Sequence, residues 1–217
     1  MIWVKICGMT TADAVAAALA ARADAIGFVF SPSPRRLTPA QAVELARPAR
    51  GRVPCIAVTR HPSQRELEQI VAEFAPDVWQ SDLADLATLA RPQGLAVLPV
   101  LRAGGAVPQR LPARLLFEGP ASGAGVACDW PAARELARRA ELVLAGGLTE
   151  TTVGEAIETV GPFGVDVSSG VEERPGLKSP EKIMRFVAAA RAAAALPASA
   201  PRGASGEPRT AREEEQR

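Results

Sequence analysis

The feature that most constrains this chain is a repeated alternation between short apolar runs and longer amphipathic segments. The apolar runs have the length and composition of buried strands, and they span 2–6, 24–30, 53–58, 77–81, 95–101, 114–118, 142–145 and 163–167. The segments with helical spacing span 11–22, 39–48, 62–74, 82–91, 130–139, 149–159 and 179–195. Only 102–112, RAGGAVPQRLP, is weak, so the helix there should be short or missing.

Eight strand-then-helix units in a row predict a parallel sheet covered by helices, and closure into a barrel removes both exposed edges. We therefore expect a single-domain α/β fold, a (β/α)8 TIM barrel, over residues 1–195. The stretch TPAQ (38–41) offers an N-cap, a first-turn proline and a capping-box glutamine, which predicts a helix start. Residues 196–217 are rich in Ala, Pro, Gly, Ser and charge and should form a disordered tail.

Composition narrows the class of protein. Hydrophobic residues make up 47% of the chain and charged residues 23%, and the formal net charge is +1, so neither nucleic acid nor a lipid surface is an expected partner. Without a long apolar run or a secretory layout at the start, we expect a cytoplasmic protein. The three cysteines, Cys7, Cys55 and Cys128, are scattered and odd in number, so free thiols are expected rather than a disulfide framework or a zinc site.

Cys7 lies where the first strand gives way to a turn. Alternation along the strand places residues 2, 4 and 6 against the helices and turns Lys5 and Cys7 toward the barrel interior. Cys7 then faces the cavity at the rim, although a small buried apolar role fits equally well. An unpaired ammonium below it would be costly, so Lys5 needs a carboxylate, and Asp166 on the neighbouring eighth strand supplies one. The pair is expected to be structural, and its cation would also help a thiolate at Cys7.

Two glycine-rich turns follow the last two strands: LAGGLTE (144–150) and VSSGVEE (167–173). Loops seven and eight are the usual phosphate site of this fold, so together the turns point to a phosphorylated substrate, whereas either alone could be a plain turn.

Two further loops carry charge at the same rim. SGAGVACDW (122–130) ends in Asp129, which on its own reads as a helix N-cap. SPSPRRLTP (31–39) carries Arg35 and Arg36, one of which could hold a substrate carboxylate with its planar fork, although such arginines are usually solvated.

In that order, KICGMT, ADAIGFVF with SPSPRR, SGAGVACDW, LAGGL and DVSSGVEERPGLKS closely resemble the phosphoribosylanthranilate isomerases of tryptophan biosynthesis, from about residue 2 to residue 193. The resemblance implies a (β/α)8 barrel that catalyses an Amadori rearrangement without cofactor or metal, acting on a phosphosugar as a monomer or homodimer. It implies that Cys7 is the general base and Asp129 the general acid, and that Arg36 contacts the anthranilate carboxylate. The implied phosphate cradle consists of Gly146, Gly147, Ser168, Ser169 and Gly170.

For that chemistry the pKa of the Cys7 thiol is expected to fall from its usual value of about 8.5, with Lys5 below it as the cause. The chain also departs from the family pattern. Where the family shows Val-Gln-Leu-His-Gly, residues 79–83 read WQSDL, so Asp82 stands in place of a histidine. The usual Leu-Leu-Asp reads LLF at 115–117, and Cys128 replaces a phenylalanine. His61, the only histidine, is expected to be exposed.

Four other functions fit this sequence less well. A metal-dependent epimerase needs a cluster of histidines, and a single histidine cannot supply it. An indole-forming synthase needs lysines at strand ends, where this chain has few, and a related sugar isomerase that uses two aspartates does not account for a cysteine base. The rival from another class is a phosphosugar-binding barrel without turnover, a reading that the missing histidine encourages.

Overall fold

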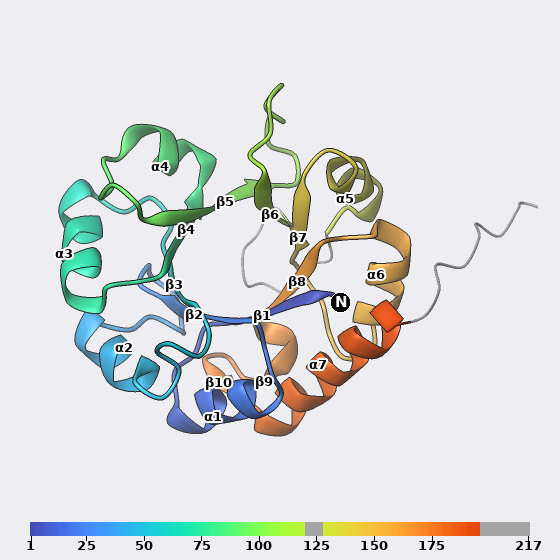
Figure 1. Cartoon of the computed structure of the whole chain (residues 1–217), viewed down its shortest axis with the longest axis horizontal. Helices are drawn as coiled ribbons and strands as arrows, with labels where there is room; N and C mark the ends of the chain where they lie inside the picture. The colour runs from blue at the N-terminus through green and yellow to red at the C-terminus, as the bar shows by residue number, and fades with distance from the viewer. Residues whose placement is uncertain (120–127, 196–217) are drawn as a thin grey trace, which may run out of the picture.

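The computed structural model describes residues 1–119 and 128–195, where eight parallel strands close into a barrel in chain order (Figure 1). The strands are β1 (Trp3–Cys7), β2 (Ala25–Val29), β3 (Cys55–Val58), β4 (Val78–Asp82), β5 (Ala96–Arg102), β6 (Arg114–Glu118), β7 (Glu141–Leu144) and β8 (Gly164–Val167). The predicted barrel is confirmed. Most of the SGAGVACDW loop and the expected tail, 196–217, lie outside the described residues.

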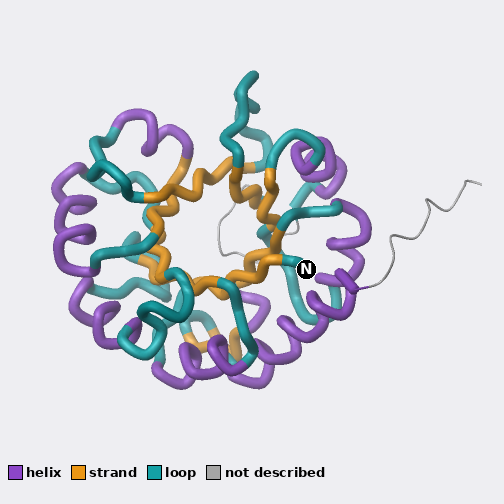
Figure 2. Tube along the Cα trace, in the orientation of Figure 1, coloured by secondary structure: helices purple, strands orange, loops and turns teal. Residues whose placement is uncertain are grey.

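Helices form a ring around the strands (Figure 2). They are α1 (Ala12–Ala20), α2 (Pro39–Ala46), α3 (Gln64–Phe74), α4 (Leu83–Thr88), α5 (Trp130–Ala137), α6 (Val153–Val160) and α7 (Pro180–Ala195). No helix joins β5 to β6, as the weak pattern at 102–112 predicted. After β8 the chain makes a short 3-10 turn, η1 (Ser169–Val171), and an antiparallel hairpin of β9 (Glu172–Arg174) and β10 (Leu177–Lys178).

Two helix boundaries differ from the pattern by several residues. The helix expected at 149–159 begins only at Val153, because the hydroxyls of Thr149 and Thr152 form a turn in which the Thr152 N–H donates to Thr149 Oγ1 at 3.3 Å. The helix expected at 82–91 ends at Thr88, after which the backbone of Leu89 is extended. Hydrogen bonds from the threonine side chains and a change to extended backbone therefore make these two helices shorter than the apolar spacing predicts.

The predicted start of α2 is confirmed in detail. The Thr38 hydroxyl accepts a hydrogen bond from the Gln41 N–H at 3.3 Å, and the Gln41 amide oxygen accepts one from the Thr38 N–H at 2.9 Å. Pro39 occupies the first helical position, where its missing N–H costs nothing. This reciprocal cap fixes where the chain leaves the loop after β2, and that loop borders the barrel mouth.

Side chains alternate across the barrel wall as expected. Val4, Ile6, Val165 and Val167 belong to an outer core in which strand residues pack with residues of the surrounding helices. A second, smaller core contains inward-facing apolar residues of the strands: Ala25, Ile56, Leu98, Val100, Leu116, Val143 and Ala145. This alternation sends Lys5 and Cys7 into the interior and places the thiol at the carboxyl end of β1. In the described part of the chain, no helix is long and apolar enough to span a membrane.

Candidate active site

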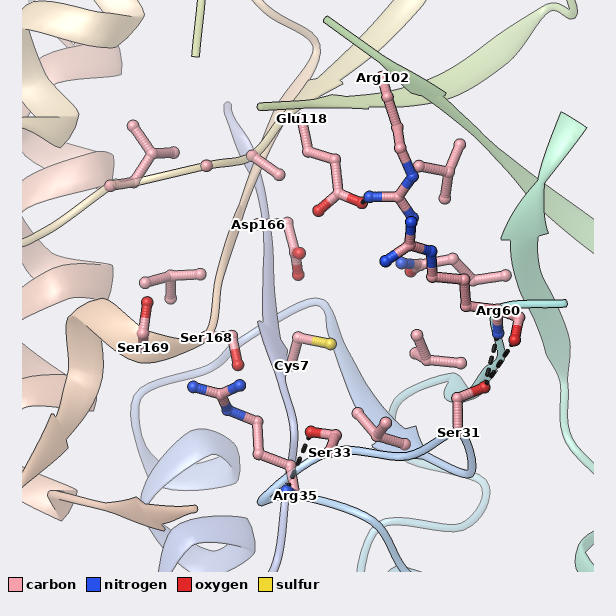
Figure 3. Close-up of a pocket in the computed structure, with 18 of the residues that line it drawn as sticks. Cys7, Ser31, Ser33, Arg35, Arg60, Arg102, Glu118, Asp166, Ser168 and Ser169 are labelled. Atoms are coloured by element: carbon pink, nitrogen blue, oxygen red, sulfur yellow. Dashed lines mark hydrogen bonds and ion pairs between the residues drawn. The ribbon is translucent and has the colours of Figure 1, made fainter. Parts of the chain in front are cut away.

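A pocket opens at the carboxyl ends of the barrel strands and is bordered by residues from every strand or the loop that follows it (Figure 3). Cys7 lines it from β1, and its sulfur points into the opening. Ser168 and Ser169 lie on one side of the thiol, and Arg102 and Glu118 lie on the other. Reactive groups of this fold lie at the carboxyl ends of the strands, so this pocket is the candidate active site.

Beneath Cys7 lies a buried ion pair. Lys5 Nζ is 2.7 Å from Asp166 Oδ1, and the Lys5 side chain is fully shielded from solvent. The two residues are register partners on the paired strands β1 and β8, which confirms the predicted pair. On the opposite side of β1, Gly27 leaves room for both groups, because a Cβ there would lie 3.0 Å from Cys7 Sγ and 3.2 Å from Lys5 Nζ.

The electrostatics of Cys7 differ from the expectation. Burial raises the pKa of the thiol, and it outweighs the lowering effect of the nearby Lys5 charge. For Lys5, burial acts to lower the pKa, but the charges of Asp166 and Cys7 and the hydrogen bonds to them together outweigh burial, and the pKa is raised. Lys5 therefore carries a positive charge, and the carboxylate of Asp166 balances it. The prediction that Lys5 would bring the pKa of Cys7 below its usual value is wrong, because burial outweighs the effect of the Lys5 charge.

The two glycine-rich turns meet at one edge of the pocket. Gly146, Gly147, Ser168, Ser169 and Gly170 all line it. Gly146 and Gly147 have positive φ values of 94° and 67°, a region where only glycine is comfortable. A Cβ on Gly170 would lie 1.9 Å from the carbonyl oxygen of Leu148, so the close contact between the turns requires glycine. The residues expected to cradle a phosphate are thus brought together.

The loop after β2 places its two arginines in opposite directions. Arg35 ends a turn in which the Arg36 N–H donates to the carbonyl oxygen of Ser33 at 3.1 Å, and Arg36 then pairs with Val29 in an isolated bridge. Arg35 is buried and lines the pocket of Cys7, whereas Arg36 is exposed and lines a neighbouring groove over α2 and α3. The pocket and the groove share Ser31, Pro32, Thr59 and Arg60. The role expected for Arg36 therefore stays a prediction, and Arg35 is the arginine that lines the pocket of Cys7 itself.

The β9–β10 hairpin holds Arg35 in place. Arg35 Nε and Nη2 donate to the two carboxylate oxygens of Glu172 at 2.7 and 2.8 Å. Lys178 Nζ donates to Glu172 Oε1 at 2.7 Å and to the carbonyl oxygen of Ser168 at 2.9 Å. Burial acts to raise the pKa of Glu172, but the hydrogen bonds from Arg35 and Lys178 lower it further. A bidentate bond on a buried carboxylate fixes the guanidinium fork beside the glycine-rich turns.

Asp129 immediately precedes α5, at the end of the barrel where β6 ends and Cys7 lies. It is exposed, and its Oδ1 accepts a hydrogen bond from the Ala132 N–H at 3.0 Å. The N-cap role that its sequence position suggested is therefore present. The loop that leads to it, 120–127, lies outside the described residues.

A charged group that the sequence did not single out occupies the opposite side of the pocket. Arg102, at the end of β5, donates through Nη2 and Nε to Asp82 of β4 at 2.7 and 3.3 Å. Its Nη1 donates to Glu118 at the end of β6. The three residues end neighbouring strands, so register brings them together although no local motif connects them.

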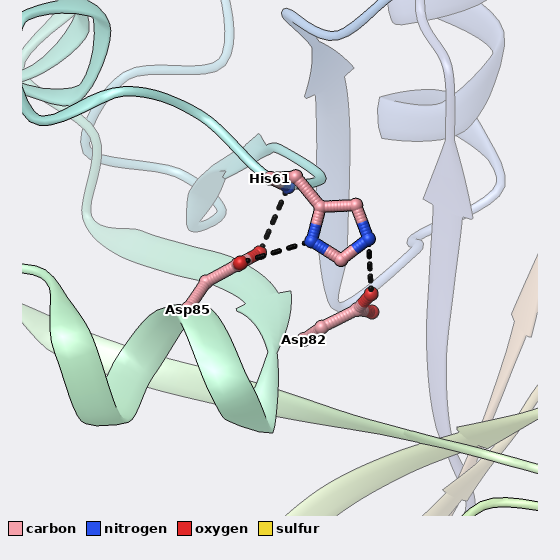
Figure 4. A group of neighbouring side chains, drawn as sticks. All are labelled: His61, Asp82 and Asp85. Atoms are coloured by element: carbon pink, nitrogen blue, oxygen red, sulfur yellow. Dashed lines mark hydrogen bonds and ion pairs between the residues drawn. The ribbon is translucent and has the colours of Figure 1, made fainter.

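His61, Asp82 and Asp85 form the described group whose ligand atoms lie close enough to hold a metal ion (Figure 4). His61 Nδ1 is 3.1 Å from Asp85, and its Nε2 is 3.7 Å from Asp82. Both carboxylates already accept protein donors: Asp85 from the Ser81 hydroxyl and Asp82 from Arg102. A guanidinium on Asp82 repels a further cation, so we assign no metal to this group. The imidazole is 62% exposed, as expected for His61.

Comparison with known proteins decides the family. The sequence profile of the N-(5'phosphoribosyl)anthranilate (PRA) isomerases matches residues 4–189. The chain belongs to this family. N-(5'-phosphoribosyl)anthranilate isomerase of Azorhizobium caulinodans is 41% identical over 217 residues, which cover 89% of this chain and 93% of that protein. The corresponding enzyme of Rhodopseudomonas palustris is 38% identical and covers 87% of this chain and 95% of its own.

Solved structures agree with the sequence match. TrpF from Jonesia denitrificans has a TM-score of 0.73 and 34% identity, covering 90% of this chain and 99% of its own. A phosphoribosyl anthranilate isomerase solved with reduced 1-(o-carboxyphenylamino)-1-deoxyribulose 5-phosphate has a TM-score of 0.73 and 25% identity, covering 88% and 100%. As a phosphoribosylanthranilate isomerase family member, the chain is an isomerase of tryptophan biosynthesis. Family membership thus favours the enzyme over the epimerase, the synthase, the two-aspartate isomerase and the barrel without turnover.

Proposed function

We propose that this barrel converts N-(5-phosphoribosyl)anthranilate into 1-(2-carboxyphenylamino)-1-deoxyribulose 5-phosphate, with Cys7 as the general base and Asp129 as the general acid. The observation that carries the assignment of Cys7 is the arrangement around one pocket: a thiol at its floor, two glycine-rich turns at one edge and a fixed arginine beside them. The assignment of Asp129 is supported by the family resemblance and by its place before α5. A thiol over a buried ion pair and a phosphate cradle suit proton transfer on an anchored phosphosugar.

The phosphate is held by the turns of Gly146, Gly147, Ser168, Ser169 and Gly170. Backbone N–H groups at such turns after the last barrel strands favour an anion. Lys178, fully shielded and bonded to Ser168, adds positive charge behind the turn. The phosphate then fixes the sugar above Cys7.

Arg35 takes the carboxylate role that the resemblance suggested for Arg36. Its Nε and Nη2 bind Glu172, which leaves guanidinium N–H groups for the anthranilate carboxylate of the substrate. Because Glu172 fixes the side chain beforehand, little conformational entropy is lost when the substrate binds.

The reaction proceeds in three steps. Asp129 donates a proton to the furanose ring oxygen, and the ring C1′–O bond breaks to give an open-chain protonated Schiff base. Cys7, as thiolate, removes the proton from C2′, and the electron pair of that C–H bond forms the C1′–C2′ double bond of an enolamine. Tautomerisation moves a proton from the C2′ hydroxyl to C1′, which yields the aminoketose. The reaction is an isomerisation, so no oxidant or other reactant is consumed.

Steady-state turnover, followed by the loss of substrate fluorescence, tests the assignment. Cys7→Ala and Asp129→Asn should each abolish detectable turnover and leave binding of the product analogue intact, since general acid–base groups contribute about 10²–10⁴-fold. Cys55→Ala is the matched control, because Cys55 is another buried thiol but packs in the outer core. Near-full turnover of Cys7→Ala would overturn the base assignment.

A further inference from the structure

The side of the pocket formed by β4, β5 and β6 carries polar side chains that the proposed mechanism does not use. Gln80, Arg102 and Glu118 all line the pocket that holds Cys7. Gln80 lies two residues before Asp82 on β4, so the two side chains share one face of the strand. Arg102 and Glu118 are register partners on β5 and β6. We refer to Gln80, Asp82, Arg102 and Glu118 as the β4–β6 cluster.

The charged side chains of this cluster are held in place by one another. Arg102 directs three of its five N–H groups at Asp82 and Glu118. The side chains of Arg102, Asp82 and Glu118 are 17%, 13% and 11% exposed, so they keep some contact with the opening. Since two carboxylates more than neutralise the one guanidinium, the cluster does not attract a further anion. It suits a neutral group that both donates and accepts hydrogen bonds.

Gln80 gives the second, independent observation. Its side chain is 5% exposed, and among the described residues its Oε1 has no hydrogen-bond partner. Buried polar atoms are nearly always satisfied, and an acceptor left without a donor destabilises the folded protein. An unsatisfied acceptor that borders a ligand pocket therefore points to a donor supplied by the ligand.

We propose that Gln80 and Arg102, with Glu118 beside them, form a subsite for the hydroxyl groups of a pentose phosphate. A sugar hydroxyl donates to Gln80 Oε1, and a sugar oxygen accepts from an Arg102 N–H that Asp82 and Glu118 leave available. The phosphate turns lie across the pocket from the cluster, so a ligand anchored there extends its hydroxyls over Cys7 toward β4 and β5. The identity of the sugar rests on the proposed function, whereas the class of ligand, a phosphorylated polyol, rests on the cluster.

Binding of two small probes to the full chain tests this subsite. Inorganic phosphate occupies only the cradle, whereas ribitol 5-phosphate also places hydroxyls at the cluster. We expect Gln80→Met to weaken ribitol 5-phosphate about three- to tenfold and to leave inorganic phosphate unchanged in calorimetric titrations. Arg102→Met, which removes a charged donor, should weaken ribitol 5-phosphate about tenfold or more.

Thermal stability distinguishes ligand binding from a purely structural role for Gln80. If Gln80 were structural, its replacement would lower Tm. Gln80→Met removes an unsatisfied buried acceptor and keeps the side-chain length, so Tm should stay the same or rise while sugar affinity falls. Gln69→Met is the matched control: Gln69 is exposed on α3 and bonds only Glu73 across one helical turn, so ribitol 5-phosphate affinity should not change.

Three outcomes would overturn the subsite: wild-type affinity of Gln80→Met for ribitol 5-phosphate, an equal loss for both probes, or a wild-type protein that binds ribitol 5-phosphate no more tightly than phosphate. The proposed function fails differently. Suppose that the wild-type protein prefers ribitol 5-phosphate and that this preference depends on Gln80, but that phosphoribosylanthranilate is not turned over. The subsite would then stand, and the proposed reaction would be wrong.

Discussion

On one side of the barrel mouth, the cations that flank Cys7 are fully buried; on the other, the charged groups remain partly in contact with solvent. The side chains of Lys5 and Lys178 are 0% exposed, each within 2.7 Å of a carboxylate. Arg102 and its two carboxylates are between 11% and 17% exposed. Charges buried this deeply cannot rearrange cheaply, so the first side fixes the reactive groups. The second side is built for contact with a ligand.

The largest expected effect comes from breaking the buried pair below Cys7. Lys5→Met leaves Asp166 without its partner and should lower the free energy of unfolding by about 3–5 kcal/mol, measured by urea denaturation. Arg102→Met should lower it by less, because Asp82 and Glu118 are more accessible to water. The double variant Lys5→Met/Asp166→Asn should recover much of the loss. Equal costs for Lys5→Met and Arg102→Met would remove the contrast between the two sides.

Substitution of each of the two adjacent arginines tests which one binds the substrate carboxylate. Arg35→Ala should raise KM for phosphoribosylanthranilate about ten- to hundredfold, because it removes a charged hydrogen bond to the substrate. Arg36→Ala, one residue away and exposed, should leave KM unchanged. Steady-state kinetics on both variants settles the question, and the opposite result would return the carboxylate role to Arg36.

The dependence of turnover on pH tests the electrostatics of the thiol. Burial raises the pKa of Cys7 more than Lys5 lowers it, so the reactive thiolate is a minor species at neutral pH. If Cys7 is the base, kcat should rise about tenfold per pH unit and continue rising past the ordinary thiol value of about 8.5. Cys55→Ala should give the same profile. A plateau already reached below pH 7 would show that the bound substrate lowers the pKa of the thiol.

The smallest effect concerns the hairpin that holds Arg35. The pKa of Glu172 is lowered: burial opposes this, but hydrogen bonds from Arg35 and Lys178 outweigh it. A carboxyl group with a lowered folded pKa stabilises the protein above its unfolded value, about 4.3, and this stability is lost as pH falls through the folded value. Glu172→Gln should therefore be less stable than wild type at pH 7, and the difference should shrink toward pH 3. A difference that does not vary with pH would contradict the assignment.

Much of the fold and one side of the mouth could be predicted from the sequence. Alternation along β1 was enough to turn Lys5 and Cys7 inward, and the order of the strands in a closed barrel was enough to place Asp166 beside Lys5. The two glycine-rich turns at the pocket edge could be located because glycines cluster directly after the last two strands. All these inferences depend on short-range periodicity combined with a single topology.

The other features of the site depend on strand register and on the balance between burial and charge, which cannot be read from a sequence. Choosing between Arg35 and Arg36 required the register of the loop against Val29, where a shift of one residue reverses the outcome. The association of Arg102 with Asp82 and Glu118 required the alignment of three strand ends. For Cys7, the sign of the pKa shift depends on how burial balances against one shared cation, and composition cannot show that balance.

Gly27 has no functional group, yet it determines what can be placed beside the thiol. A methyl group at this position would lie 3.0 Å from the sulfur and 3.2 Å from the ammonium, so one of these groups would have to move by a few tenths of an ångström to admit it. A substitution can therefore disturb the thiol without changing any residue that reacts. A single added carbon on β2 would press on the sulfur from inside the barrel wall and leave the surface of the protein unaltered.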